Sequence, residues 1–220
     1  MNTYAVTLPH YSVGPDVFDH LEFVARFYGR KAAVVGGATA LEKAGPSLRA
    51  GLEKAGMRVT DWFVYGENAT NAAVDRILES PGCREADVIF GVGGGRAIDT
   101  VKTASDILKK PFFSVPTVAS NCAPVSAIAV IYNEDGSLSH YHFTERCAEH
   151  CFINTAVILD SPRKLFWAGI GDALSKQCEA LLSSRGQDLE LAKRFVRELR
   201  DNCNILETFP EGGALPRDRI

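Results

Sequence analysis

Short apolar runs alternate with longer amphipathic segments through the first half of the chain. Each run is rich in Val, Ala, Phe or Ile and is bounded by glycine, proline or charged residues, a pattern typical of buried strands. The runs cover residues 31–37, 57–65, 88–92 and 111–116. Between them, apolar residues recur at helical spacing. This alternation predicts an α/β fold in which helices cover both faces of a parallel sheet.

The predicted helices have recognisable boundaries. One reaches about Ala55 and is expected to break or kink at Gly45-Pro46. The next spans residues 68–79 and is closed by Pro81-Gly82, and a third runs to about Lys109. Residues 4–11 are expected to be extended. The turn Gly14-Pro15-Asp16 then starts a helix with an apolar face: Val17, Phe18, Leu21, Val24 and Phe27.

The pattern changes after Pro116. Residues 127–132 and 137–143 predict a β-hairpin, and residues 156–159 predict a further strand. From about residue 162 the pattern is helical, with helices predicted over 172–182 and 189–206. A second domain, made of helices, is therefore expected to begin near residue 162.

Three consecutive glycines, Gly93-Gly94-Gly95, separate the strand at 88–92 from the helix that follows. They allow the backbone to approach a ligand closely, and the free N–H groups of the helix favour an anion such as a pyrophosphate. A tight packing turn is the alternative. The usual G-x-G-x-x-G fingerprint is absent, because Arg96 occupies its last position. Since Gly36-Gly37 ends an earlier strand, both turns are expected at the same edge of the sheet.

Composition and charge narrow the class of protein. A formal net charge of −3 over 220 residues gives no reason to expect nucleic-acid or membrane binding. The chain has no membrane-length apolar run and no signal-like start, which favours a cytoplasmic location. Cys147, His150 and Cys151 would be helical neighbours and suggest zinc, but no fourth ligand lies nearby. His140 and His142 alternate in the predicted hairpin and are expected at the surface.

Three blocks of residues carry a resemblance to a known family. They are Gly93-Gly94-Gly95 with Asp99 and Lys102, the stretch from Ser114 to Tyr132, and Ala168–Leu174 with Glu179-Ala180. In order and spacing they resemble the iron-containing (group III) metal-dependent alcohol dehydrogenases, in the branch of glycerol and hydroxycarboxylate dehydrogenases. The resemblance implies a dehydroquinate synthase-like fold. Residues 1–161 would be a nucleotide-binding α/β domain, and 162–220 the start of an all-α metal-binding domain, here incomplete.

The resemblance also implies a reaction and a site. Such enzymes use NAD or NADP and one divalent metal, zinc or iron, and are often homo-oligomers. The substrate would be a small polyol, or a 2-hydroxy acid interconverted with its 2-oxo acid. Asp172 would be the catalytic metal ligand, although from the residues alone it is equally a helix N-cap. The resemblance assigns the cofactor to Gly37, Gly93, Gly94, Gly95, Arg96, Thr117, Ser120, Ser126, Ile128 and Tyr132.

Three positions depart from the family pattern. Arg96 replaces a lysine, which keeps the positive charge and adds a planar fork for phosphate. Cys122 replaces an aspartate that contacts the polyol, as in the hydroxycarboxylate branch; the alternative is a small residue that only lines the cleft. Gly37 replaces an aspartate that NAD-preferring relatives place against the ribose. Without the charge of that aspartate, the 2′-phosphate of NADP is not repelled, so NADP is permitted as the cofactor.

The metal ligands are incomplete in this sequence. The family's remaining ligands are histidines downstream of the third block, and a catalytic metal needs about three protein ligands. All five histidines precede Asp172: His10, His20, His140, His142 and His150. Two hypotheses follow, namely the front part of a longer dehydrogenase, or a truncated, non-catalytic relative that binds a nucleotide or a partner. Sugar-phosphate cyclases resembling dehydroquinate synthase share the glycine block, but their set of basic residues is not found.

Overall fold

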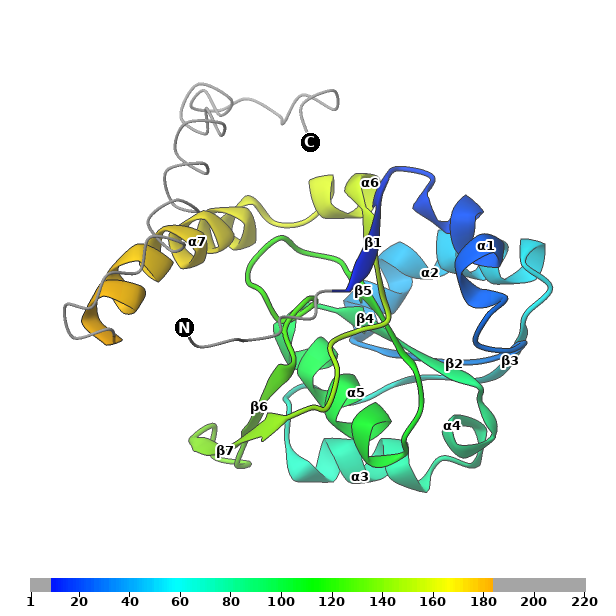
Figure 1. Ribbon diagram of the computed structural model, residues 1–220, viewed down its shortest axis with the longest axis horizontal. Helices are drawn as coiled ribbons and strands as arrows, with labels where there is room; N and C mark the ends of the chain where they lie inside the picture. The colour runs from blue at the N-terminus through cyan, green and yellow to red at the C-terminus, as the bar shows by residue number, and fades with distance from the viewer. Residues whose placement is uncertain (1–8, 184–220) are drawn as a thin grey trace, which may run out of the picture.

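The computed structural model describes residues 9–183, and within them six strands form one sheet (Figure 1). These strands are β1 (His10–Gly14), β2 (Lys31–Gly36), β3 (Arg58–Val64), β4 (Val88–Gly93), β5 (Phe112–Pro116) and β8 (His150–Asn154). Their spatial order is β1-β8-β5-β4-β2-β3, and each neighbouring pair is parallel. The predicted α/β fold with a parallel sheet is confirmed.

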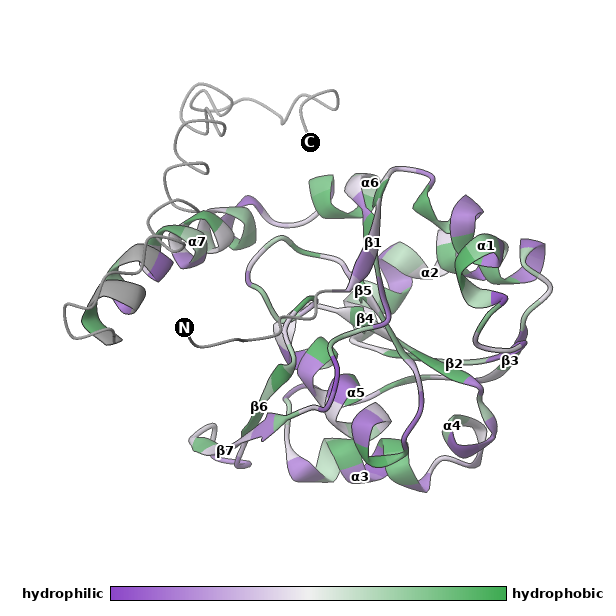
Figure 2. Cartoon of the chain, in the orientation of Figure 1, coloured by the Kyte–Doolittle hydropathy of each residue, from purple (hydrophilic) through white to green (hydrophobic). Residues whose placement is uncertain are grey.

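Helices cover both faces of this sheet. Alternate residues of each strand point to opposite sides, so each face carries apolar side chains that the helices bury. In β2, Ala32 and Val34 enter one core, whereas Ala33 and Val35 enter the other. Green and purple positions alternate around α3 and α5, as expected of helices with one buried side (Figure 2). The first core is covered by η1 (Val17–His20), α1 (Leu21–Ala25) and α2 (Ala38–Lys54), the second by α3 (Asn71–Glu79), α4 (Pro81–Glu85) and α5 (Gly95–Ile107).

The chain reverses its direction across the sheet between β2 and β4. From β2, helix α2 leads outward to β3 on one face; from β4, helix α5 leads to β5 on the other face. In open parallel sheets such a reversal leaves a crevice outside the carboxyl ends of the two strands, and ligands bind there. The turns that follow β2 and β4 border this crevice.

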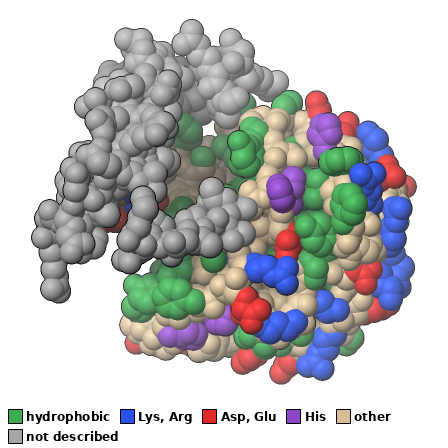
Figure 3. Space-filling model, in the orientation of Figure 1, with side chains coloured by type: hydrophobic (Ala, Val, Ile, Leu, Met, Phe, Trp, Pro, Cys, Tyr) green, Lys and Arg blue, Asp and Glu red, His purple; other side chains and the backbone are tan. Residues whose placement is uncertain are grey.

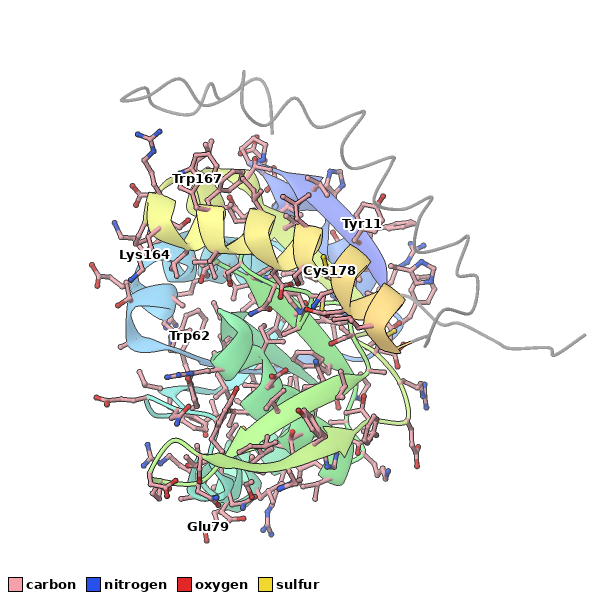
Figure 4. All side chains as sticks on the ribbon, turned by 90° about the vertical axis from the view of Figure 1, so that its left-hand side faces the viewer. Tyr11, Trp62, Glu79, Lys164, Trp167 and Cys178 are labelled. Atoms are coloured by element: carbon pink, nitrogen blue, oxygen red, sulfur yellow. The ribbon has the colours of Figure 1, made fainter. Side chains whose placement is uncertain are left out.

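The remaining elements extend from the sheet. β6 (Ile128–Tyr132) and β7 (Leu138–Phe143) form the predicted antiparallel hairpin. α6 (Thr155–Leu159) leads to α7 (Arg163–Ser183), which projects from the body of the molecule (Figure 1). Figure 4 shows α7 running across the molecule, with Lys164 and Trp167 toward one end and Cys178 toward the other. The predicted domain boundary at 161/162 falls just before α7 and stays a prediction.

The strand predicted at residues 156–159 is wrong, because these residues form helix α6. Asn154 sets the boundary: its side chain accepts a hydrogen bond from the Val157 N–H at 3.1 Å and caps the helix. The strand here is β8, which precedes the helix and was not predicted. Since His150 and Cys151 lie in this strand, the helical spacing assumed for a zinc site with Cys147 does not exist.

Two predicted helix boundaries also change. α7 begins at Arg163 rather than at residue 172, so Asp172 lies inside the helix and is not its N-cap. Pro81-Gly82 does not simply end a helix; Pro81 is the first residue of α4, which Ser80 caps by accepting from the Cys83 N–H at 3.0 Å.

The remaining differences concern α2 and the first helix. α2 runs unbroken through Pro46. Phe27 is 73% exposed, so it does not belong to the apolar face of the first helix. The predicted helix at 189–206 and most of the extended segment at 4–11 lie outside the described residues. Within residues 9–183, no helix has the length and apolar character needed to cross a membrane.

Candidate functional site

The glycine-rich turn after β4 lies beside the turn after β2. The Gly37 N–H donates to the Val92 carbonyl at 3.1 Å, and a Cβ added at Gly93 would lie 3.7 Å from the Gly37 nitrogen. Gly93 has a φ of 150°, and its added Cβ would lie 2.7 Å from the Cβ of Ala97. Backbone conformation and space therefore both require glycine at this position. The predicted meeting of the two turns at one edge of the sheet is confirmed.

The loop that follows β5 packs against the same turn. The Thr117 N–H donates to the Gly93 carbonyl at 3.2 Å. A Cβ added at Gly94 would lie 3.2 Å from Val118 Cγ2, and one at Gly95 would lie 2.5 Å from Asn121 Nδ2. Gly94 is the N-cap of α5 and provides no side-chain cap. The first N–H groups of α5 can therefore be satisfied by an anion.

Aromatic and cationic side chains surround this turn. Arg96 lies in the first turn of α5, with its guanidinium carbon 5.9 Å from the centroid of the Tyr132 ring. Tyr65 follows β3 directly, and its N–H donates to the Gly36 carbonyl at 3.1 Å. Burial raises the pKa of the Tyr65 phenol, so this group stays neutral near the turn. Sequence reasoning missed Tyr65 and Asn121, although both follow a strand end, where ligand-binding residues collect.

Asp99 and Lys102 connect α5 to the hairpin. The Lys102 ammonium donates to the Ile128 carbonyl at 2.7 Å and to Ser126 Oγ at 3.4 Å. Its partner is Asp99, and Lys102 Nζ lies 3.3 Å from Asp99 Oδ1. Lys102 is 2% exposed and Asp99 is 7% exposed. Burial lowers the pKa of Lys102 and raises that of Asp99, while each charge opposes the shift of the other. Ser126 and Ile128 are thus held beside α5.

Helix α7 meets the loop after β5 at a glycine. A Cβ added at Gly169 would overlap the Ala119 carbonyl oxygen and lie 3.0 Å from the Cα of Ser120. Asp172 lies three residues further along and so shares that side of the helix. Its carboxylate is 3.5 Å from the Lys176 ammonium. The exposed Cys122 belongs to the same loop, so the two predicted substrate and metal residues lie on elements that meet.

A metal does not fit the described residues alone. Among residues 9–183, no three His, Cys, Asp or Glu side chains gather into a group that could hold an ion. Asp172 therefore belongs to no group of three candidate ligands within this part of the chain. His142 is bound elsewhere, with Nε2 2.8 Å from the Asp106 carboxylate, and His140 is exposed on the hairpin.

A cavity of about 180 Å³ lies at the opposite edge of the sheet, where β5 begins. Several of its charged groups already pair: Lys109 lies 3.1 Å from Glu145, and Arg146 lies 3.1 Å from Glu149. It is lined by none of the residues that the family resemblance assigns to the cofactor, substrate or metal. The candidate site is therefore assigned to the carboxyl edge of the sheet, where the turns after β2 and β4 meet the loop after β5.

The fold and these turns define a class of protein. It is an open α/β protein in which a glycine-rich turn, followed by a helix without a side-chain cap, lies where the chain reverses direction across the sheet. Comparison with known families is more specific. Residues 9–160 match the model of the iron-containing alcohol dehydrogenases. The chain belongs to this family.

Individual relatives point to one branch of the family. A glycerol dehydrogenase from Thermotoga maritima is 37% identical over 117 residues, which cover 53% of this chain and 32% of that enzyme. Hydroxycarboxylate dehydrogenase A from Escherichia coli is 31% identical, with 60% of this chain and 44% of that enzyme covered. The crystal structure of glycerol dehydrogenase from Schizosaccharomyces pombe has a TM-score of 0.78 at 28% identity, covering 92% of this chain and 54% of that one.

These matches confirm the resemblance to the glycerol dehydrogenase-like branch. The chain spans about half, or less, of the length of these relatives.

Proposed function

We propose that this protein is an NAD(P)-dependent, metal-dependent oxidoreductase of glycerol dehydrogenase type, acting on the CH–OH group of a small polyol or a 2-hydroxy acid. One observation carries the proposal. In this chain of the iron-containing alcohol dehydrogenase family, a glycine-rich turn leads into helix α5, whose N-terminus has no side-chain cap. The turn lies where the chain reverses direction across the sheet, with Arg96 beside it. Such a turn binds the pyrophosphate of a dinucleotide.

Each part of the turn has a role in holding the cofactor. Gly93, Gly94 and Gly95 bring backbone N–H groups close to the phosphates, since any side chain there would contact a neighbour. Arg96 offsets the negative charge with its guanidinium. The rest of the cofactor would lie along the loop after β5 and the hairpin strand, against Thr117, Ser120, Ser126, Ile128 and Tyr132.

The cofactor is NAD or NADP, and Gly37 bears on this choice. A Cβ at Gly37 would meet nothing nearer than 3.9 Å, so the turn has space beside it. No carboxylate at this position repels a 2′-phosphate. Both cofactors are therefore proposed to bind.

For the substrate, Cys122 is the position of interest. An uncharged thiol does not repel a carboxylate, which suits a 2-hydroxy acid as well as a polyol. The likeness to hydroxycarboxylate dehydrogenase A supports the same assignment.

The metal is proposed as zinc or iron, with Asp172 as one ligand. If bound near the substrate, such an ion would polarise the alcohol oxygen and lower the pKa of the alcohol. Residues 9–183 hold no group of three candidate ligands, so residues outside this range would have to complete the ligand set. Asp172 itself is suitably placed, on the side of α7 that meets the loop carrying Cys122.

The proposed partners are small molecules and further copies of the same chain, in a cytoplasmic homo-oligomer. Nucleic acid and membranes are not proposed partners. Figure 3 supports this, because basic and acidic side chains are interleaved along the right-hand edge of the face it shows. A net charge of −3 agrees with that mixture.

The test combines binding with turnover in the intact protein. NADH and NADPH are titrated by fluorescence, and oxidation of glycerol and of a 2-hydroxy acid such as lactate is then measured. We expect cofactor binding and turnover that a chelator abolishes and added Zn²⁺ or Fe²⁺ restores. Full turnover in excess chelator would contradict the metal, and absence of cofactor binding would overturn the whole proposal.

A second candidate is a non-catalytic relative that binds a nucleotide or a partner. The lack of a metal-binding group among residues 9–183 favours it. It predicts NADH binding without turnover at any metal concentration, so the same experiment separates the two candidates.

A further inference from the structure

One edge of β6 is bonded to side chains of α5 and, at Tyr132, to the segment before α3, and not to another of the named strands. In the described part of the chain, β6 has β7 as its single strand neighbour. The Ala127 carbonyl accepts from the Thr144 N–H, at the end of the β7 side. In an antiparallel pair, the backbone groups of alternate residues face away from the partner. Those of residues 128, 130 and 132 therefore form the outer edge of the hairpin.

Side chains of α5 occupy this outer edge. The Ile128 carbonyl accepts from the Lys102 ammonium at 2.7 Å, and the Val130 N–H donates to Asp99 Oδ2 at 3.1 Å. The next outward group, the Tyr132 N–H, donates to the Ala69 carbonyl at 2.8 Å. α5 and β6 lie side by side in Figure 1, in agreement with their close packing. The ion pair thus takes the place of a neighbouring strand.

This arrangement is costly to build. Asp99 and Lys102 are almost completely buried, and removing two charges from water carries a large desolvation cost. Apolar residues of similar size could fill the same space. They would not bond a backbone carbonyl and a backbone N–H of β6 at two fixed points, and that geometric function distinguishes the pair from ordinary packing.

The same helix also carries the glycine-rich turn. α5 begins at Gly95, and Asp99 and Lys102 lie on its second and third turns. One rigid element therefore joins the turn to the hairpin strand. Arg96 strengthens the connection at the other end of β6, where its guanidinium faces the Tyr132 ring.

We propose that Asp99 and Lys102 are positioning residues, which hold β6 at a fixed distance from the glycine-rich turn so that a dinucleotide contacts both at once. The inference rests on the proposed function, because it assumes that a dinucleotide is the ligand. Neither residue needs to touch the cofactor. Their effect is transmitted through the backbone of Ile128 and Val130 to the wall formed by Ser126, Ile128 and Tyr132.

The test uses the double variant D99N/K102M in the intact protein. It removes both charges together, so no unpaired charge stays buried, and the amide oxygen that D99N introduces can still accept from the Val130 N–H. The bond to Ile128 is lost. K109M is the matched control, because Lys109 lies just beyond the same helix and is exposed, with a partner, Glu145, outside β6. Binding of ADP is compared with binding of NADH, and circular dichroism and thermal unfolding report whether the fold is kept.

For D99N/K102M we expect the Kd for NADH to rise by about tenfold, the loss of one charge-assisted hydrogen bond, while the Kd for ADP changes by less than about threefold. K109M should match the wild type for both ligands. Unchanged NADH binding would overturn the proposal. An equal loss of ADP and NADH in a folded variant would also overturn it, because the pair would then act on the turn and not on the wall.

If the double variant does not fold, K102R is used instead, because it keeps the charge and changes the geometry. The proposal then requires that K102R raises the Kd for NADH more than the Kd for ADP. Exchange of the Val130 amide hydrogen gives a second measurement: it should be faster in D99N/K102M, where a neutral amide replaces the carboxylate acceptor, than in K109M. If the wild-type protein binds neither NADH nor NADPH, the proposed function fails, and the positioning role fails with it. That outcome is distinct from normal wild-type binding with an unaffected variant.

Discussion

At the scale of the residue, one methyl group at Gly93 would change both the backbone and its surroundings. The φ of 150° disfavours any other residue, and the added Cβ would approach that of Ala97 to 2.7 Å. We expect Gly93→Ala to lower the free energy of unfolding by about 1–3 kcal/mol. The Kd for NADH should rise by about tenfold, because the turn moves away from the phosphates. Chemical denaturation and fluorescence titration measure the two effects.

Gly136→Ala is the control for this variant. Gly136 also has a positive φ, 82°, but lies in the hairpin turn with no atom within 4 Å of an added Cβ. It should lose about 1 kcal/mol of stability and bind NADH normally. If Gly93→Ala also bound NADH normally, the turn would not be the phosphate site.

Gly37 allows a second prediction at this scale. The turn has space for a side chain, since an added Cβ meets nothing closer than 3.9 Å. Gly37→Asp should raise the Kd for NADPH by about tenfold through repulsion of the 2′-phosphate, with NADH affected by less than about threefold. Gly37→Asn has the same size without the charge and should leave the ratio of the two Kd values near that of the wild type. Equal effects of Asp and Asn would show that charge is not the cause.

At the scale of the element, α2 explains why a proline did not break a helix. Pro46 lies on the exposed side, while apolar residues at helical spacing before and after it pack into the same core. These are Leu41, Ala44, Leu48 and Leu52. Burial of this stripe outweighs the lost hydrogen bond at Pro46, a balance that local sequence signals do not contain.

Pro46→Ala should therefore stabilise the protein. Alanine restores an N–H donor toward Glu42, and part of the gain is offset by greater freedom of the unfolded chain. We expect the free energy of unfolding to rise by about 1–2 kcal/mol in a denaturant titration. Glu53→Ala, an exposed substitution in the same helix, should change it by less than about 0.5 kcal/mol. A loss of stability in Pro46→Ala would mean that α2 needs the proline.

Short elements were harder to predict than long ones. The apolar run at 156–159 suits a strand or a helix equally, and the N-cap bond from Asn154 decides between them. β8 is buried between β1 and β5, yet its residues His150, Cys151 and Asn154 do not look like a typical strand. By contrast, β2, β4, β5 and α5 were predicted well, because each combines a long apolar pattern with a glycine or proline boundary.

At the scale of the whole molecule, stability depends on His150, which lies where β8 pairs with β1 and β5. It is 7% exposed, and its Nε2 is 2.9 Å from Ser12 Oγ. Burial, and then the nearby charge of His10, lowers the pKa of His150 to about 4. The unfolded chain takes up a proton near its ordinary pKa of about 6.5, so protonation favours unfolding. The stabilising contribution is complete above that pH and declines as pH falls toward 4.

We expect wild-type stability to fall by roughly 3 kcal/mol or less from this group over that pH window. His150→Gln keeps a partner for Ser12 without titrating, so its stability should decline less steeply between the same pH values. Denaturant titrations at several pH values give the comparison, and equal slopes for wild type and His150→Gln would contradict the role of His150.

The candidate site was partly predictable at this scale. The two glycine turns could be placed at one edge because strand ends and glycines are local signals. Contacts between distant segments could not be predicted, such as Lys102 with Ile128 and Gly169 with Ala119. They depend on how α5, the hairpin and α7 pack. The cofactor and metal roles stay predictions, which the titrations above test.

The position of β1 at the edge of the sheet has a consequence for the order of folding. In the described part of the chain its strand partner is β8, with His10 opposite His150, so the first of the six strands in chain order pairs with the last of them. While the chain emerges from the ribosome, β2 to β5 can assemble with their helices, whereas β1 stays unpaired until β8 has been synthesised. Contacts this distant in sequence form slowly, and an unpaired strand is prone to aggregate meanwhile. Closure of the sheet by β1 and β8 is therefore expected to be the late step in folding.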